Sequence, residues 1–180
     1  MSLLILSKRH QDIIIQSSNL NYKLNLLNQK LMDLQSYASS IANSPLSVFD
    51  LMNAPASMFG RMSNFMQVSN HDASIYAQRN VNQAVSMNQA DYQNFMNSQA
   101  QQGQTAQADA AYRNMIGQKL YQNVIDSLTK KETDALNREE KKIEQQKAQV
   151  ETQVKMLDSE EKTVSEAEGK EAEKTAPKFA

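Results

Sequence analysis

The sequence contains no cysteine and no tryptophan, and only 4 glycines and 3 prolines interrupt its 180 residues. Without cysteine, the chain can form neither disulfides nor thiolate metal sites. A β-rich fold of this length needs many turns and many β-branched or aromatic residues, and these are scarce here. The glycines, at positions 60, 103, 117 and 169, never cluster into a phosphate-binding loop. The composition therefore favours an all-α protein.

The chain also lacks an excess of charge of either sign. Its formal net charge is −1, and no run of Lys and Arg is longer than a pair. A nucleic-acid-binding protein needs a basic stripe to displace condensed counterions, so we expect no nucleic-acid partner. The hydrophilic character comes instead from 16 Asn and 20 Gln residues, which carry no charge.

Long apolar runs are missing as well, since none approaches the ~20 residues that span a bilayer. The early stretch "SLLIL" is short, and the positive charges of Lys8 and Arg9 follow it. A secretory signal peptide has its positive charges before a longer apolar segment. We therefore expect a cytoplasmic protein, or one exported without a cleavable signal peptide.

What the sequence does contain is a stripe of apolar residues at alternating steps of four and three, the spacing that keeps two helices in contact. This pattern predicts a long helix over residues 3 to 42. One series recurs every seventh residue, at Leu6, Ile13, Leu20, Leu27, Leu34 and Ile41. A second series follows four residues after each of the first five, at His10, Ser17, Leu24, Leu31 and Ala38. The firm part is the first seam, formed by Leu20, Leu24, Leu27, Leu31, Leu34 and Ile41.

A second, weaker seam lies in a charged stretch. No Glu precedes Glu132, and 11 basic and 13 acidic residues follow from Lys130 to Lys178. Opposite charges at helical spacing support a helix there. The second seam recurs every seventh residue, at Leu136, Ile143, Val150, Leu157 and Val164. Because the first seam is too apolar to face one charged helix alone, we expect a second copy of the chain to cover it, giving a homo-oligomer.

The predicted architecture is an elongated helical hairpin or coiled coil, with long N-terminal and C-terminal helices and short helices between. The expected segments are a coiled-coil helix at 1–43, Met/Phe-rich short helices at 44–70, Asn/Gln-rich helices at 71–128, a charged coiled-coil helix at 129–168 and a disordered tail at 169–180.

Several local signals mark helix ends between the two seams. Ser44 before Pro45 predicts the start of a short helix that runs to about Asn53, and Pro55 predicts the start of another. Ser69 and Asp72 have the spacing of a capping box and predict a restart. Gly103 is the residue most expected to interrupt the later helices, because glycine weakens a helix interior.

Residues 46 to 66 concentrate Met and Phe, and a candidate partner or membrane face is formed by Met58, Phe59, Met62, Phe65 and Met66. The favoured interpretation is a hydrophobic turn that closes the hairpin. The alternatives are a groove for a helical partner, because Met-rich faces adapt to several partners, and a membrane-surface contact. An interfacial helix carries Lys or Arg on its polar face, and here only Arg61 does.

No arrangement of residues indicates a reaction. His10 and His71 are 61 positions apart, and neither has the neighbours of a zinc or nucleophilic site. His10 reads as a tolerated polar position in the stripe, and the acidic residues between 132 and 173 read as a solvated helical face. We expect no enzyme, no catalytic or metal site, no cofactor and no small-molecule substrate.

These observations predict a non-enzymatic structural or scaffolding protein that acts by coiled-coil self-association and by helix-mediated binding of a protein partner. The absence of Cys and Trp, the Ser/Asn/Gln-rich first half and the seams near both ends resemble flagellar and type III axial proteins. That resemblance implies the alternative of an assembly subunit or substrate exported without a signal. A peripheral membrane-surface protein is a further alternative.

Overall fold

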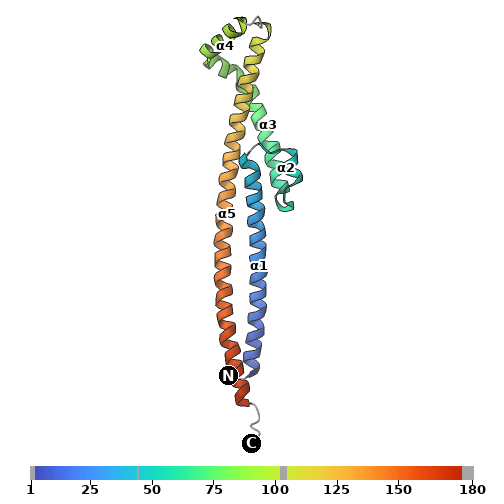
Figure 1. Cartoon of the computed structure of the whole chain (residues 1–180), viewed down its shortest axis with the longest axis vertical. Helices are drawn as coiled ribbons and strands as arrows, with labels where there is room; N and C mark the ends of the chain where they lie inside the picture. Colours follow the sequence, from blue (N-terminus) through green and yellow to red (C-terminus); the bar gives the residue numbers. More distant parts are fainter. Residues whose placement is uncertain (1–2, 44, 102–104, 176–180) are drawn as a thin grey trace. The chain divides into compact units, whose positions relative to one another are not determined.

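The computed structural model describes residues 3–43, 45–101 and 105–175, nearly all of which are helical (Figure 1). Within these ranges the chain forms no strand. The helices are α1 (Leu3–Asn43), α2 (Val48–Met52), α3 (Ala56–Met87), α4 (Gln89–Gln101) and α5 (Thr105–Thr175). The protein is therefore all-α, with long helices near both ends of the chain, as the sequence predicts.

The chain forms two compact units, which we describe separately. The first unit consists of Met1–Gln35 and Arg138–Ala180, and it contains most of α1 and the second half of α5. The second unit is Ser36–Asn137. It contains the end of α1, the whole of α2, α3 and α4, and the part of α5 up to Asn137. Both boundaries fall inside helices, the first in α1 and the second in α5.

In the first unit, α1 and α5 run antiparallel. The side chain of Gln35 donates a hydrogen bond from Nε2 to Glu140 Oε1 at 2.7 Å. Near the other end of the pair, Arg9 Nε donates to Glu160 Oε1 at 2.8 Å. A later residue of α1 therefore contacts an earlier residue of α5, which means that the two helices run in opposite directions. They lie side by side in Figure 1.

The core of the first unit is built from the residues that recur every seventh position. Leu6, Ile13 and Val164 form one buried cluster, against which Leu157 and Ala167 pack. Farther along the pair, the buried apolar side chains are Leu27 and Leu34 from α1 and Ile143 and Val150 from α5. The heptad spacing therefore predicts the contact between the two helices, because it places one apolar row on each helix along the line where they meet.

In the second unit, α3 runs antiparallel to α5. Arg61 in α3 binds Glu132 with an Nε–Oε1 distance of 2.7 Å, and the Tyr121 hydroxyl donates to Asn70 Oδ1 at 2.6 Å. The buried face of α3 includes small side chains four residues apart, at Ser69, Ala73 and Ala77. Small side chains at a helix contact allow the two backbones to approach closely.

The start of α2 differs from the prediction by three residues. Ser47 is the N-cap, and its hydroxyl accepts a hydrogen bond from the Asp50 backbone N–H while the Asp50 carboxylate accepts one from the Ser47 backbone N–H. This reciprocal pair is a capping box, which satisfies two orphan donors. Ser44, the predicted cap, lies outside the described residues. The prediction at Pro55 is confirmed, because α3 begins at Ala56, directly after it.

The predicted restart at Ser69 is wrong, because α3 is one continuous helix of 32 residues. Ser69 is buried within it, and its hydroxyl donates to the Met66 carbonyl at 3.3 Å. A serine inside a helix satisfies its hydroxyl on the preceding turn in this way, so its spacing from Asp72 is incidental. The helix instead ends before Asn88, whose side-chain amide donates to the Ala84 carbonyl at 2.9 Å.

The later part of the chain is more continuous than predicted. α5 spans 71 residues without a break at Lys130, where the composition changes. It also passes through Gly169, so residues 169–175 are helical where we expected disorder. The ion pair between Lys174 and Glu171, at 3.7 Å and three residues apart, supports this last part. Gly103 and residues 176–180 lie outside the described residues.

Candidate interaction surfaces

The structure buries most of both predicted seams. In the first seam, Leu27, Leu34 and Ile41 are buried, and Leu20, Leu24 and Leu31 are half-buried. In the second seam, Leu136, Ile143, Val150 and Val164 are buried, and Leu157 is half-buried. Within the first unit the two seams belong to the two helices that form the pair, so each supplies the cover for the other.

This burial corrects the expectation that a second copy covers the first seam. Leu27 and Leu34 are already buried inside one chain, in a unit formed by α1 and α5. Charged residues beside the second seam do not prevent the contact, because long Lys and Glu side chains lay their methylene groups along apolar surface and keep their charges in water. The residues of the first seam left half-exposed at the edge of this contact are Leu20, Leu24 and Leu31.

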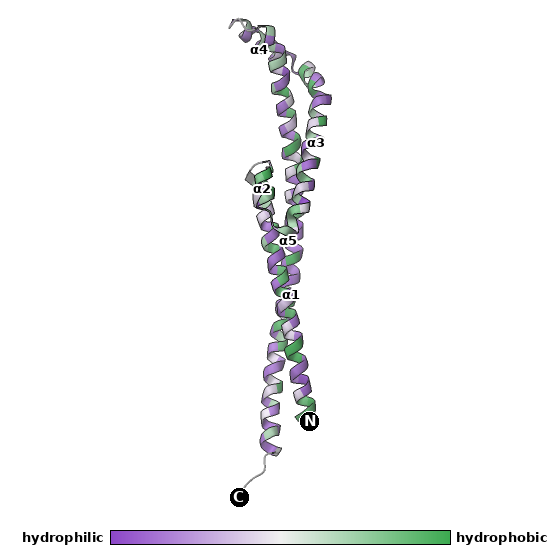
Figure 2. Cartoon of the chain, turned by 90° about the vertical axis from the view of Figure 1, so that its right-hand side faces the viewer, coloured by the Kyte–Doolittle hydropathy of each residue, from purple (hydrophilic) through white to green (hydrophobic). Residues whose placement is uncertain are grey.

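Tyr37 is buried in the second unit, but the other large apolar residues of α1 outside the heptad stripe are exposed. At about 3.5 residues per turn, six of them project from the side of α1 opposite the buried row. We call them the outer face of α1; they are Leu4, Ile5, Ile15, Tyr22, Leu26 and Met32. Figure 2 shows apolar colouring at the start of α1. In the sequence, Leu3 to Leu6 and Ile13 to Ile15 are two runs of consecutive apolar residues, and consecutive residues of a helix lie on different sides of it.

The other helix of the same unit has no such face. Among the described side chains of α5 from 138 to 174, Met156 is the one large apolar residue that is exposed. A helix that is apolar on all sides is normally buried, and a contiguous exposed apolar surface marks an interaction site. The two helices of the pair therefore differ, because α1 leaves several large apolar side chains exposed and the described residues 138–174 of α5 leave only Met156.

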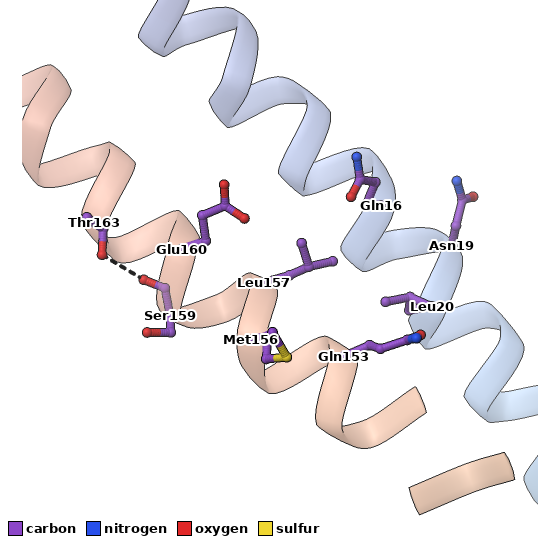
Figure 3. A pocket seen from close by; sticks show the side chains of 9 residues that line it. All are labelled: Gln16, Asn19, Leu20, Gln153, Met156, Leu157, Ser159, Glu160 and Thr163. Carbon is purple, nitrogen blue, oxygen red and sulfur yellow. Dashed lines mark hydrogen bonds between the residues drawn. The ribbon is translucent and has the colours of Figure 1, made fainter. Parts of the chain in front are cut away.

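A groove of about 820 Å³ lies between α1 and α5 in the first unit (Figure 3). In Figure 3, Leu20 of α1 and Leu157 of α5 extend into the space between the two helices, with Met156 beside them. The rim is polar and includes Asn19, which lies one heptad before Leu26 of the outer face. The floor of the groove is apolar at Leu20 and Leu157, and no residue of the outer face lines it.

Ion pairs lie beside the core of the first unit. Arg9 of α1 binds Glu160, and His10 contacts two carboxylates of α5, with Nδ1 2.7 Å from Glu168 and Nε2 3.6 Å from Glu161. The hydrogen bond with Glu168, reinforced by its charge and by Glu161 against a smaller effect of burial, raises the pKa of His10 above its usual range. From the sequence, His10 is expected to be a tolerated polar residue, and neither of these partners is predicted.

The predicted Met/Phe face does not form one surface. Met62 is buried in the core of the second unit, Met58, Phe65 and Met66 are half-buried, and Phe59 is exposed. Phe59 is accompanied by three exposed residues of α2, which packs on α3. We call this group the α2–α3 patch; it consists of Val48, Phe49, Met52 and Phe59. The nearby Arg61 is bound to Glu132, so its charge is already matched.

A buried polar junction joins three helices of the second unit. Tyr37 from α1 is fully buried, Arg61 from α3 lies with its guanidinium carbon 5.9 Å from the Tyr37 ring centroid, and Glu132 from α5 binds Arg61. Among the described residues, the Tyr37 hydroxyl has no hydrogen-bond partner of ordinary geometry. Burial, and after it the Glu132 carboxylate, raise the pKa of Tyr37 well above its usual range.

A second polar cluster fastens α4 to α5. The Tyr92 hydroxyl donates to Asp109 Oδ1 at 2.9 Å, and Arg113 Nε donates to Asp109 Oδ2 at 2.8 Å. Arg113 and then Tyr92 hold the pKa of Asp109 below its usual range. The rings of Tyr92 and Phe95 pack against Tyr112, each with a centroid distance of 5.3 Å. Since every group in this cluster has a structural partner, the arrangement serves packing.

The described residues contain no group of three or more His, Cys, Asp and Glu side chains placed to hold a metal ion. None of the described helices has an apolar stretch long enough to cross a membrane. The features that stand out are therefore surfaces. The outer face of α1 could have been found from the sequence, by collecting the apolar residues that the heptad stripe leaves over.

Comparison of the chain with protein-family models, with curated proteins and with solved structures found no match.

Proposed function

We propose that this protein is a non-enzymatic structural protein that self-associates through the outer face of α1. The observation that supports this proposal is the asymmetry of the first unit. Six large apolar side chains are exposed on the outer side of α1. On the described residues 138–174 of α5, Met156 is the only large apolar side chain that is exposed. A two-helix pair with one apolar outer side gains stability by covering that side with another helix.

A second copy of the chain is the partner that this surface fits. If each of the six side chains exposes on the order of 100 Å², a contact between two copies buries roughly 1,200 Å² in total, which is the lower limit for a specific interface. Two outer faces that pack on each other form an isologous contact, in which both copies use the same residues and the assembly closes at two.

The test replaces three residues at the centre of the outer face by glutamine, which is polar and favours helix, and leaves the core residues unchanged. We expect Ile15→Gln, Tyr22→Gln and Leu26→Gln, combined in one variant, to halve the mass of the assembly in sedimentation velocity without loss of helix by circular dichroism. The matched control is Met156→Gln, the exposed apolar residue of α5, which should leave the mass of the wild-type assembly unchanged.

Two results would overturn the proposal. One is a wild-type chain that stays a single copy at every concentration tested. The other is a triple variant with the wild-type mass, which would show that the outer face takes no part in assembly.

A further inference from the structure

His10 occupies a position that the heptad stripe normally gives to an apolar residue. Leu6, four residues before it, and Ile13, three residues after it, are both buried in the core cluster with Val164 of α5. A polar side chain between two core residues weakens the contact unless it finds partners across the interface. His10 finds two, because Glu168 and Glu161 of α5 both approach its ring, the first at 2.7 Å and the second at 3.6 Å.

The charges around the ring favour a positive imidazole. From α5, the helix packed against α1 in this unit, Glu161 and Glu168 face the ring, while Glu160 is bound by Arg9. On α1 itself, the residues three and four positions away are Leu6, Ser7, Ile13 and Ile14, none of which is charged. The protonated ring donates from both nitrogens and meets two carboxylates, whereas the neutral ring donates from only one nitrogen.

We propose that His10, Glu161 and Glu168 form a proton-operated clasp that fastens the first turns of α1 to α5. In the protonated state the clasp holds Leu6 and Ile13 against Val164. In the neutral state one donor and the attraction between charges are lost, and the first turns of α1 open more often. This regulation goes beyond self-association and does not depend on it.

The direction of the effect follows from linkage. The contacts with Glu168 and Glu161 raise the pKa of His10 in the folded chain above its value in the unfolded chain. The stabilisation is therefore complete below the unfolded value, about 6.5, and disappears as the pH rises through the folded value. Between about pH 6 and pH 8.5 histidine is the side chain that ordinarily changes its charge, so a change in this window reports on histidine.

Amide hydrogen exchange of residues 3–16 tests the clasp. After correction for the intrinsic pH dependence of exchange, we expect several-fold slower exchange at the lower pH than at the higher. The His10→Gln variant should lose this difference. The His10→Lys variant, which keeps its charge at both values, should exchange slowly at both. The matched control is His71→Gln, which removes the exposed histidine of α3 and should retain the wild-type difference.

The NMR titration of the His10 ring gives a second, direct measurement. Its midpoint should lie above the ordinary histidine range and fall in the Glu168→Gln variant. If His10→Gln keeps the wild-type pH difference in exchange, or if Glu168→Gln leaves the midpoint unchanged, the clasp does not exist. Repeating the exchange in the Ile15→Gln, Tyr22→Gln and Leu26→Gln background separates the clasp from assembly, because the pH difference should remain there.

Discussion

Replacing the buried Tyr37 by phenylalanine should stabilise the protein. The side chain of Tyr37 is fully buried, and its hydroxyl is the one buried side-chain polar atom without a hydrogen-bond partner among the described residues. The Glu132 carboxylate, which Arg61 binds at 2.7 Å, lies close enough to raise the pKa of Tyr37. The substitution removes the hydroxyl alone and leaves the ring in place, so it tests one atom.

The magnitude follows from the cost of a buried unsatisfied group. Leaving a buried polar group without a partner costs about 1–3 kcal/mol. The ring of phenylalanine retains most of the contact with the Arg61 guanidinium, so the loss of cation–π attraction stays below about 0.5 kcal/mol. We take the lower end of the range of about 1–3 kcal/mol as the cost of the buried hydroxyl. The free energy of unfolding should therefore increase by about 1 kcal/mol in the Tyr37→Phe variant.

Urea unfolding followed by circular dichroism measures the change. With a slope of about 1–3 kcal/mol per molar urea, the midpoint should rise by roughly 0.5 M. Wild type and variant must be compared at one protein concentration, because self-association makes apparent stability depend on it. The matched control is Tyr22→Phe, which removes a hydroxyl from a side chain that is 67% exposed and should change the free energy of unfolding by less than about 0.5 kcal/mol.

The same substitution has a signature at high pH. Burial and Glu132 raise the pKa of Tyr37 in the folded chain, whereas the unfolded chain releases this proton near pH 10. Above that pH the unfolded state binds fewer protons than the folded state, so stability falls as the pH rises. Tyr37→Phe should lose less stability there than wild type. A variant that is destabilised by about 1 kcal/mol at neutral pH would refute the reasoning, because it would mean that the hydroxyl makes a hydrogen bond worth that amount.

Two further predictions concern the seam and the α2–α3 patch. Leu27→Ala should lower the free energy of unfolding by about 2–4 kcal/mol, because it empties space in a core where Leu27 is 6% exposed, whereas its neighbour Leu26, 41% exposed, should cost less than about 1 kcal/mol when replaced by Ala. Equal losses in urea unfolding would place the seam elsewhere. The chain should not sediment with neutral or anionic vesicles, because the α2–α3 patch has no surrounding cluster of Lys and Arg. Salt-insensitive sedimentation that disappears on combining Phe49→Ser with Phe59→Ser would contradict this and favour membrane contact.

The sequence predicts α1 well because one periodic pattern determines it. The heptad residues from Leu6 to Ile41 mark both the extent of the helix and its buried side. Single capping signals are less reliable, since a Ser followed three residues later by Asp occurs at Ser47, where it begins a helix, and at Ser69, where it does not. The row of small residues that includes Ala73 and Ala77 distinguishes the two sites, because its four-residue spacing continues through Ser69.

The partners of His10 could not be read from the sequence alone. Glu161 and Glu168 are 151 and 158 residues away, and only the register of the antiparallel pair brings them together. That register depends on how every residue of the two seams packs, which a periodic pattern leaves undetermined. The exposed residues of α2 were missed for a different reason, since a helix of five residues is too short to show periodicity.

The antiparallel pairing in the first unit also has a consequence for the chain during its synthesis. In the second unit, the contacting residues Tyr92 and Asp109 are 17 positions apart, and Arg61 and Glu132 are 71 apart. In the first unit, Arg9 can contact Glu160 only after 151 more residues have been made. At 5–20 residues per second, the ribosome needs roughly 8 to 30 s to make the 151 residues from Arg9 to Glu160. During most of this time, the nascent chain carries an α1 segment whose Leu27 and Leu34 have no α5 to cover them. Neighbouring ribosomes on one message hold such segments at the same time, so the first helix made is the one most exposed to wrong pairing between nascent chains.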